Sequence, residues 1–216
     1  MIFNFNRLMI KHSVKLKGVI HIGGYIGEEY NLYLQNDVRD IIFFEPIQEH
    51  FNVLKSNVGH RPTLVRKALG NENKKIEINI SKSPGGFQNG SGASSSILNP
   101  KLHLTHHPHI TFEEKREVDM IKLDDFWSER SDLNKEDYNF INIGIQGYEL
   151  EALKGSKGTL ETVDHILSEV NREEVYEGCV IVDELDEFLG SFNFQRLETN
   201  WQGGIWGDAF YSKVSK

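Results

Sequence analysis

The chain contains little cysteine, no long apolar run and fewer basic than acidic residues, and each shortage excludes a class of protein. Cys179 is the single cysteine among 216 residues, which excludes an internal disulfide and a cysteine-based zinc site. Such low cysteine usage is typical of a reducing compartment, so we expect a cytoplasmic protein. No stretch reaches the roughly 20 apolar residues of a membrane-spanning helix. The first residues lack the apolar centre and small-residue cleavage site of a secretory signal, so none is predicted.

The charge balance and the apolar content limit the partners and the domain organisation. There are 24 Lys and Arg against 32 Asp and Glu, a net charge of −8, so we expect no nucleic-acid partner. An apolar content of 38% with 11% aromatic residues is sufficient for a real core, and the length fits one domain. We expect this domain to span 18–216, with an insertion at about 71–115. Residues 1–17 are predicted to be a lead-in helix or segment that packs on the domain.

Short apolar runs alternate with helix-compatible segments in the first third of the chain. Runs that are apolar on both faces are typical of interior strands in a parallel sheet. Such runs or short strands occur at 19–22, 41–44 and 63–65. The resulting strand–helix–strand–helix–strand order predicts a doubly wound α/β fold. After the insertion the same rhythm resumes with a strand at 118–121, and the chain closes with two antiparallel strands predicted at 194–197 and 208–212.

Closely spaced glycines follow the first predicted strand. The segment from His21 to Gly27 has the pattern H-x-G-G-x-x-G, which departs from the G-x-G-x-x-G of NAD-dependent dehydrogenases. Taken alone, it suits a nucleotide-binding turn or merely a tight turn between strand and helix. Glu45 lies 22 residues beyond Gly23 (45 − 23) and ends the second strand. An acidic residue about 20 residues past such a turn binds ribose hydroxyls in dinucleotide-binding folds.

These segments and several later ones resemble the FkbM family of S-adenosylmethionine (SAM)-dependent methyltransferases. The resemblance covers about Gly18 to Tyr211, and its most specific part is Gln146 to Gly155. The other segments that carry it are Val19-Ile20-His21-Ile22-Gly23-Gly24, Phe44-Glu45-Pro46, Lys67-Ala68-Leu69-Gly70, Ser94-Ser95-Ser96, Leu123-Asp124-Asp125-Phe126 and Gly207-Asp208-Ala209-Phe210-Tyr211.

The resemblance implies a class I methyltransferase fold, with a mostly parallel seven-stranded sheet and an antiparallel C-terminal strand pair. It also implies SAM as cofactor and O-methylation of a sugar or glycan hydroxyl. The methionine end of SAM would lie at the glycine turn, the ribose at Glu45 and the adenine near Ala68. The cofactor-binding residues expected on this basis are Gly23, Gly24, Tyr25, Glu45, Pro46, Ala68 and Asn142.

The family's acidic residue at the end of its fourth strand is missing, because the corresponding motif here has Gly144. A carboxylate at that position could serve as a base or metal ligand, and glycine can do neither. The next predicted strand ends with Ser168-Glu169-Val170-Asn171 and delivers Glu169 and Asn171 to the same sheet edge. With His21 they are the candidate catalytic residues. Glu149 could point at the pocket, or it could be an ordinary first-turn glutamate favoured by the helix dipole. Without a carboxylate at 144 we expect a metal-independent reaction.

Three interpretations of function remain open from the sequence. The first is a SAM-dependent O-methyltransferase acting on a sugar or glycan, either free-standing or part of a larger glycan-modifying protein or assembly. The second, motivated by Gly144, is a SAM-binding protein without catalytic activity. The third, an NAD-dependent oxidoreductase, is disfavoured by the glycine spacing. Four histidines at 103, 106, 107 and 109 could bind zinc, although a solvated loop is the simpler interpretation.

Overall fold

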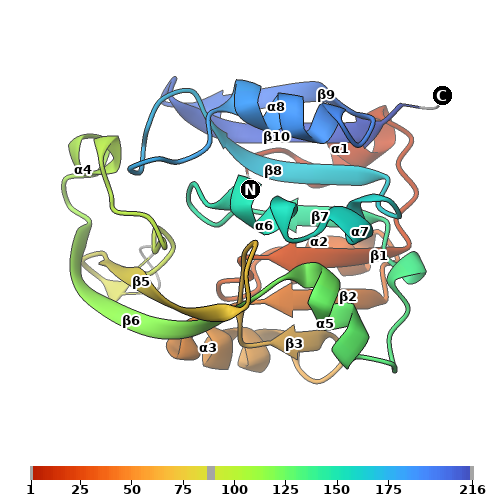
Figure 1. Cartoon of the computed structure of the whole chain (residues 1–216), viewed down its shortest axis with the longest axis horizontal. Helices are drawn as coiled ribbons and strands as arrows, with labels where there is room; N and C mark the ends of the chain where they lie inside the picture. Colours follow the sequence, from red (N-terminus) through yellow and green to blue (C-terminus); the bar gives the residue numbers. More distant parts are fainter. Residues whose placement is uncertain (1, 87–90, 215–216) are drawn as a thin grey trace.

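The main sheet of the molecule has seven strands in the order β3-β2-β1-β7-β8-β10-β9 (Figure 1). A computed structural model describes residues 2–86 and 91–214. The strands of this sheet are β1 (Gly18–Ile22), β2 (Asp40–Phe44), β3 (Thr63–Val65), β7 (Phe140–Ile143), β8 (His165–Asn171), β9 (Phe194–Gln202) and β10 (Trp206–Lys213). Strands β3, β2, β1, β7 and β8 pair in parallel, whereas β10 is antiparallel to both of its neighbours. The predicted fold class is therefore confirmed.

The strand order reverses between β1 and β7. From β1 the chain steps outward through β2 to β3, and the later strands β7 and β8 continue on the other side of β1. In open α/β sheets, ligands bind outside the carboxyl ends of the strands at such a reversal point. The glycine turn that follows β1 therefore lies where a cofactor site is expected.

Helices cover both faces of the main sheet and enclose two apolar cores. The helices are α1 (Phe5–Lys11), α2 (Tyr30–Gln35), α3 (Gln48–Val58), α5 (Leu123–Glu129), α6 (Glu149–Lys154), α7 (Lys157–Leu160), α8 (Val182–Gly190) and a 3₁₀ turn (Lys135–Asp137). Helices α1, α2 and α3 pack on one face and α5 to α8 on the other, in front of the sheet in Figure 1. Side chains alternate along each strand. Val19 therefore belongs to the core under α1, α2 and α3, and Ile20 to the core under α5 to α8. This two-sided burial explains the continuous apolar runs.

The stretch between β3 and α5 builds a second sheet in the order β4-β6-β5. Its strands are β4 (Ala68–Leu69), β5 (Lys74–Lys82) and β6 (Thr111–Ile121), and the short helix α4 (Leu102–His106) lies between the last two. In Figure 1 the β5–β6 ribbon curves away from the main sheet toward α4. Part of the Gly- and Ser-rich stretch at 83–96 lies outside the described residues.

Strand β6 begins seven residues earlier than the strand predicted at 118–121 (118 − 111). Its first half, Thr-Phe-Glu-Glu-Lys-Arg-Glu, has too few apolar residues to show a strand pattern. It is extended because it pairs with β5 along its length, with ion pairs such as Lys75–Glu117 at 2.7 Å across the two strands. Pairing between distant segments thus decides the conformation here, and local propensity does not.

A close backbone contact fixes α6 against the segment that follows β4. At Gly155 a Cβ atom would lie 1.9 Å from the carbonyl oxygen of Gly70. The carbonyl of Gly155 also accepts a hydrogen bond from the Asp124 N–H at the start of α5, at 3.1 Å. Gly155 has φ −81°, so the contact and not an unusual backbone conformation requires glycine.

We expect Gly155→Ala to lower the free energy of unfolding by about 1–3 kcal/mol, since the backbone of two segments must move apart. Gly190→Ala is the matched control, because Gly190 ends α8 with no other atom within 4 Å of a Cβ. Urea unfolding followed by tryptophan fluorescence measures both. Equal stability of the two variants would contradict the proposed packing constraint.

Candidate functional site

A cavity lies at the carboxyl ends of β1, β2 and β7, with about 590 Å³ of empty space that is partly open to solvent. The main sheet forms its floor, and residues of β4, β5 and the segment 92–97 close its other sides. The lining residues are Ile22, Gly23, Tyr25, Phe44, Glu45, Pro46, Ile47, His50, Lys67, Ala68, Leu69, Ile78, Gly92, Ala93, Ser95, Ser96, Ile97, Gly144, Ile145 and Gln146.

The glycine turn lies directly against the end of β7. Gly23 has φ +85°, and a Cβ atom there would lie 2.2 Å from the carbonyl oxygen of Gly144. The N–H groups of Gly23 and Gly24 both donate to the carbonyl of Phe44, at 3.0 and 2.9 Å. Glycine at 23 is therefore required both by backbone conformation and by close approach. The turn also brings Tyr25, with φ +44°, to the cavity wall.

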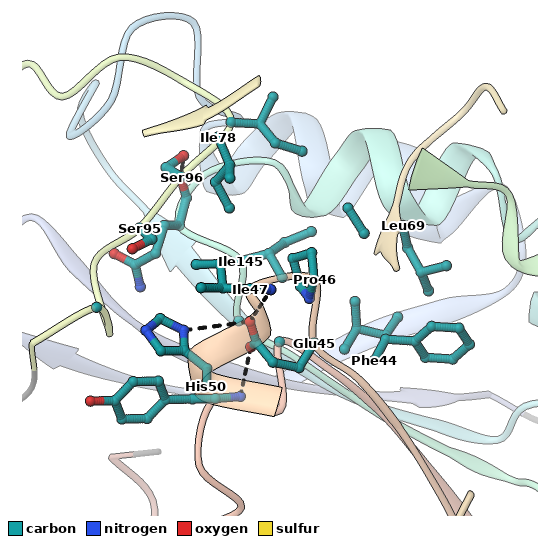
Figure 2. Close-up of a pocket in the computed structure, with 18 of the residues that line it drawn as sticks. Phe44, Glu45, Pro46, Ile47, His50, Leu69, Ile78, Ser95, Ser96 and Ile145 are labelled. Atoms are coloured by element: carbon teal, nitrogen blue, oxygen red, sulfur yellow. Dashed lines mark hydrogen bonds and ion pairs between the residues drawn. The ribbon is translucent and has the colours of Figure 1, made fainter. Parts of the chain in front are cut away.

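The carboxylate of Glu45 is held in place at the edge of the cavity. Oε2 accepts the Tyr25 N–H at 2.9 Å and Oε1 accepts the Ile47 N–H at 2.8 Å (Figure 2). Nδ1 of His50 lies 3.4 Å from Oε1, and the Glu45 residue is 4% exposed. A carboxylate has about four lone-pair positions, so two backbone donors leave acceptors that can receive ribose hydroxyls. The position and the preorganisation of Glu45 both fit the expected ribose site.

The part of the cavity beyond Glu45 is apolar. Ile47, Ala68 and Leu69 are buried, and Ile78 lies on β5 of the second sheet, to which Ala68 and Leu69 of β4 also belong. Figure 2 shows Leu69 and Ile78 above the Phe44–Ile47 segment. A flat aromatic base suits such a surface, and the lone carboxylate beside it suits a sugar diol. The described lining therefore fits the adenosine part of SAM.

The segment 91–96 is tied down across the cavity by hydrogen bonds to three parts of the chain. Tyr25 Oη donates to the carbonyl of Ser91 at 2.9 Å, and Ser96 Oγ donates to the carbonyl of Gln146 at 2.7 Å. Tyr176 Oη lies 2.8 Å from the carbonyl of Ser94. The segment thus connects the glycine turn with the turn after β7.

Five of the expected site residues are not among those that line the cavity: His21, Gly24, Asn142, Glu169 and Asn171. His21 and Asn142 are neighbours on β1 and β7 and both bond to the hydroxyl of Tyr33, with His21 Nδ1 at 3.0 Å and Asn142 Nδ2 at 2.7 Å. All three side chains are buried between the sheet and α2, and burial lowers the pKa of His21. The described contacts place His21 and Asn142 in the core, so their expected catalytic and cofactor-binding roles have no support from cavity geometry.

Glu169 lies beside the cavity at the end of β8. A Cβ atom at Gly144 would be 3.5 Å from Glu169 Oε2, and the same oxygen accepts Gln146 Nε2 at 2.8 Å. Gln146 in turn accepts the Tyr176 hydroxyl at its Oε1, at 2.7 Å. Glu169 therefore faces the space that a side chain at 144 would occupy. Asn171 is on the same strand face two residues later, and both polar atoms of its buried amide bond to no described residue.

Sequence reasoning left the role of Glu149 open, and the structure gives it a definite position. The side chain starts α6 but turns back: its Oε1 accepts the N–H groups of Ile145 and Gly147, at 2.9 and 3.1 Å. Glu149 is 0% exposed, and its Oε2 has no partner among the described residues. Burial raises the pKa of Glu149 to about 6. Its place two residues after Gly147, in the turn that follows β7, is the signal that could have found it.

The histidine-rich stretch does not form a metal site in the described part of the chain. His103 packs on His107, Phe112 and Tyr176, with ring centres 4.9, 5.3 and 5.4 Å away, and burial lowers its pKa to about 4. Over the described residues, no group of three or more His, Cys, Asp or Glu side chains is arranged to hold a metal ion.

Among the described residues, no helix is long and apolar enough to cross a membrane.

The raised pKa of Glu149 predicts how stability varies with pH. The native state keeps this proton up to about pH 6, whereas the unfolded chain loses it near 4.5, so stability falls as the pH rises through that window. Between pH 4 and pH 7 this carboxyl group should lower the free energy of unfolding of the wild type by about 2 kcal/mol, and Glu149→Gln should abolish that decrease. Urea unfolding at each pH measures it, with Glu151→Gln on the same helix as control. Parallel curves for wild type and Glu149→Gln would contradict the assignment.

Comparisons with known proteins agree with this geometry. The family model described as "Methyltransferase FkbM domain" matches residues 21–196. The 2-O-methyltransferase NoeI of Sinorhizobium fredii (strain NBRC 101917 / NGR234) is 28% identical over 193 residues, which cover 88% of this chain and 76% of NoeI.

Two solved structures share the fold at low sequence identity. An uncharacterized protein from Listeria monocytogenes serotype 4b is 10% identical with a TM-score of 0.53, over 100% of this chain and 70% of that one. Magnesium protoporphyrin IX methyltransferase from Synechocystis PCC 6803 is 8% identical with a TM-score of 0.50, over 98% and 77% of the two chains. Because the family model spans most of the sheet together with the whole cavity lining, the chain belongs to the FkbM family of SAM-dependent methyltransferases.

Proposed function

We propose that this protein methylates a hydroxyl group of a sugar or glycan, with SAM as the methyl donor. The observation that carries the proposal is the position of Glu169, whose Oε2 lies 3.5 Å from the place of a Cβ at Gly144, a residue of the cavity wall. A carboxyl group in that place can take up the proton that a hydroxyl loses on methylation. The similarity to NoeI, named a 2-O-methyltransferase, supports an oxygen acceptor.

The cavity residues would hold the cofactor by three kinds of contact. Glu45 would accept the ribose hydroxyls, the apolar surface around Ala68 and Ile78 would contact the adenine, and the Gly23–Tyr25 turn would lie beside the methionine portion. Pro46 continues the wall next to Glu45. When bound, SAM supplies a methyl group on a positively charged sulfur, a strong electrophile toward oxygen.

The polar groups at the end of β8 would orient the acceptor. Glu169 and the buried Asn171 amide lie on one strand face, and the Asn171 amide has donor and acceptor capacity that no described residue uses. Holding a hydroxyl in line for attack supplies much of the rate, since positioning alone can lower a barrier by several kcal/mol. A net charge of −8 favours an uncharged acceptor over nucleic acid.

Gly144 supports a second candidate, a SAM-binding protein without catalysis. In that case the chain would bind SAM and its demethylated product but would transfer no methyl group to any acceptor. The distinguishing test is turnover with SAM and a panel of mono- and oligosaccharides, followed by the release of S-adenosylhomocysteine. Release that depends on a sugar supports the methyltransferase, and tight SAM binding without turnover supports the second candidate.

We expect Glu45→Gln to weaken SAM binding by about tenfold or more, because an amide offers one acceptor oxygen where the carboxylate offers two. Isothermal titration calorimetry with SAM measures this change. The matched control is Glu49→Gln, an exposed position on α3 that pairs with Arg116 outside the cavity. Unchanged affinity in a folded Glu45→Gln protein would exclude the ribose role.

We expect Glu169→Gln to reduce turnover by about a hundredfold while SAM affinity stays the same, because the amide cannot accept the hydroxyl proton. The substitution keeps an oxygen that can accept Gln146 Nε2. Glu173→Gln, at an exposed position just beyond β8, is the control and should retain wild-type turnover. Full activity of Glu169→Gln would remove Glu169 from the chemistry.

A further inference from the structure

One tyrosine hydroxyl joins the turn after β7 to the wall of the cavity. Tyr176 is fully buried, and its Oη lies 2.8 Å from the carbonyl oxygen of Ser94 and 2.7 Å from Oε1 of Gln146. At its other end the same amide donates from Nε2 to Oε2 of Glu169, at 2.8 Å. Three short contacts therefore connect Glu169, at the end of β8, with the segment 91–96.

This connection lacks one hydrogen when Glu169 is a carboxylate. A carboxylate only accepts, so Gln146 directs its NH₂ group at Glu169 and its oxygen at the tyrosine. The Tyr176 hydroxyl carries a single hydrogen, and both Gln146 Oε1 and the Ser94 carbonyl are acceptors. Among the described residues, no other group donates to the Ser94 carbonyl. One of the two acceptors therefore stays unpaired.

A protonated Glu169 supplies the missing hydrogen. The two ends of an amide have nearly the same shape, so Gln146 can make a half turn without displacing its neighbours. The O–H of Glu169 then donates to the Gln146 oxygen, and the Gln146 NH₂ group donates to Tyr176 Oη. The Tyr176 hydrogen is left for the Ser94 carbonyl. Each of the three contacts now has one donor and one acceptor.

We propose that Gln146 and Tyr176 are positioning residues that couple the protonation of Glu169 to the hold on the segment 91–96, and thereby to cofactor exchange. This inference rests on the proposed function, in which Glu169 is the base. The acceptor oxygen bonds to the methyl carbon, the carbon–sulfur bond breaks with its electron pair on sulfur, and the hydroxyl proton moves to Glu169. A half turn of the carboxyl group presents its protonated oxygen to Gln146. The segment is then held until Glu169 loses this proton to solvent.

The place of the segment in the site gives this coupling a consequence. Residues 92, 93, 95 and 96 line the cavity, so the segment has to move when the cavity opens on that side. Two of its other bonds, from Tyr25 Oη to Ser91 and from Ser96 Oγ to the Gln146 carbonyl, do not involve Glu169. Protonation of Glu169 therefore adds the contribution of one hydrogen bond to a segment that is already attached.

The surroundings of Glu169 agree with a change of charge near neutral pH. Burial raises the pKa of Glu169 well above its usual range, and the charges of Glu149 on α6 and Asp208 on β10 raise it further. Gln146 and Tyr176 face it as neutral groups. The resting base is the carboxylate, and the protonated form follows methyl transfer.

Amide hydrogen exchange in the segment 91–96, corrected for the intrinsic effect of pH, tests the coupling without an acceptor. In the wild type we expect exchange to become about fivefold faster as the pH rises through the titration of Glu169, since one hydrogen bond is lost. Glu169→Gln offers an NH₂ group where the protonated carboxyl has its O–H, so exchange should stay slow at every pH. Tyr176→Phe deprives the Ser94 carbonyl of its donor, so exchange should be fast at every pH.

Tyr138→Phe is the matched control, because Tyr138 is a buried tyrosine before the opposite end of β7 and should keep the wild-type pH dependence. Release of S-adenosylhomocysteine, measured by displacement with excess SAM, should show the same order of rates. Entry and exit pass the same segment, so the affinity should not change. If Tyr176→Phe does not fold, wild type and Glu169→Gln still decide.

A pH dependence that survives in Tyr176→Phe would overturn the proposal, and so would fast exchange in Glu169→Gln. A merely structural role for Tyr176 would speed exchange but leave its pH dependence in place. The exchange measurement and turnover on sugars fail separately. Coupling in a protein that methylates no sugar would reject the proposed function alone, and turnover without coupling would reject only the role of Gln146 and Tyr176.

Discussion

The close contact between the turn after β1 and the end of β7 is the constraint on which the site depends. The position of a Cβ on Gly23 is only 2.2 Å from the carbonyl oxygen of Gly144, so no other residue at 23 permits this approach. The contact brings Gly23 and Gly144 together in the wall of the cavity, and Glu169 lies next to Gly144. Glu45 belongs to the same assembly, because its carboxylate holds the Tyr25 N–H at the other end of the turn.

Gly144 changes what the end of β7 can contribute. Gly144 offers no carboxylate, and Oε2 of Glu169 on the adjacent strand lies 3.5 Å from the position that a Cβ at 144 would take. Gln146 links Glu169 to Tyr176, and Tyr176 and Ser96 link the same turn to the segment 91–96. The cofactor cavity and the proposed acceptor side are thus connected by hydrogen bonds through a single turn.

The parts of the fold that sequence could predict are those determined by burial on both faces of a strand. The apolar run at 41–44 became the buried strand β2 with the predicted bounds apart from Asp40, and the short strand predicted at 63–65 became β3, which is partly buried. The early part of β6 could not be predicted, because its charged residues adopt a strand conformation only through pairing with β5. Helices α4 and α7 have five and four residues, which is too short for a periodic pattern.

The site residues also fall into those that the sequence could predict and those that it could not. Glu45 was predictable because its distance from the glycine turn follows from the βαβ geometry, and the structure places it in the cavity wall. His21 was a candidate because of its type and position, but alternation along β1 turns it toward Tyr33 and the core. The position of Glu149 and Glu169 around one turn required three-dimensional information, since twenty residues separate them (169 − 149). Glu149 accepts backbone N–H groups of that turn, and Glu169 accepts the side chain of Gln146.

A crystal structure with S-adenosylhomocysteine bound would test the central claim most directly. The account predicts that Glu45 bonds to the ribose hydroxyls and that the side of the sulfur that carried the methyl group faces Glu169 across Gly144. A sulfur turned toward a different wall, with Glu169 shielded from it by other side chains, would contradict the account.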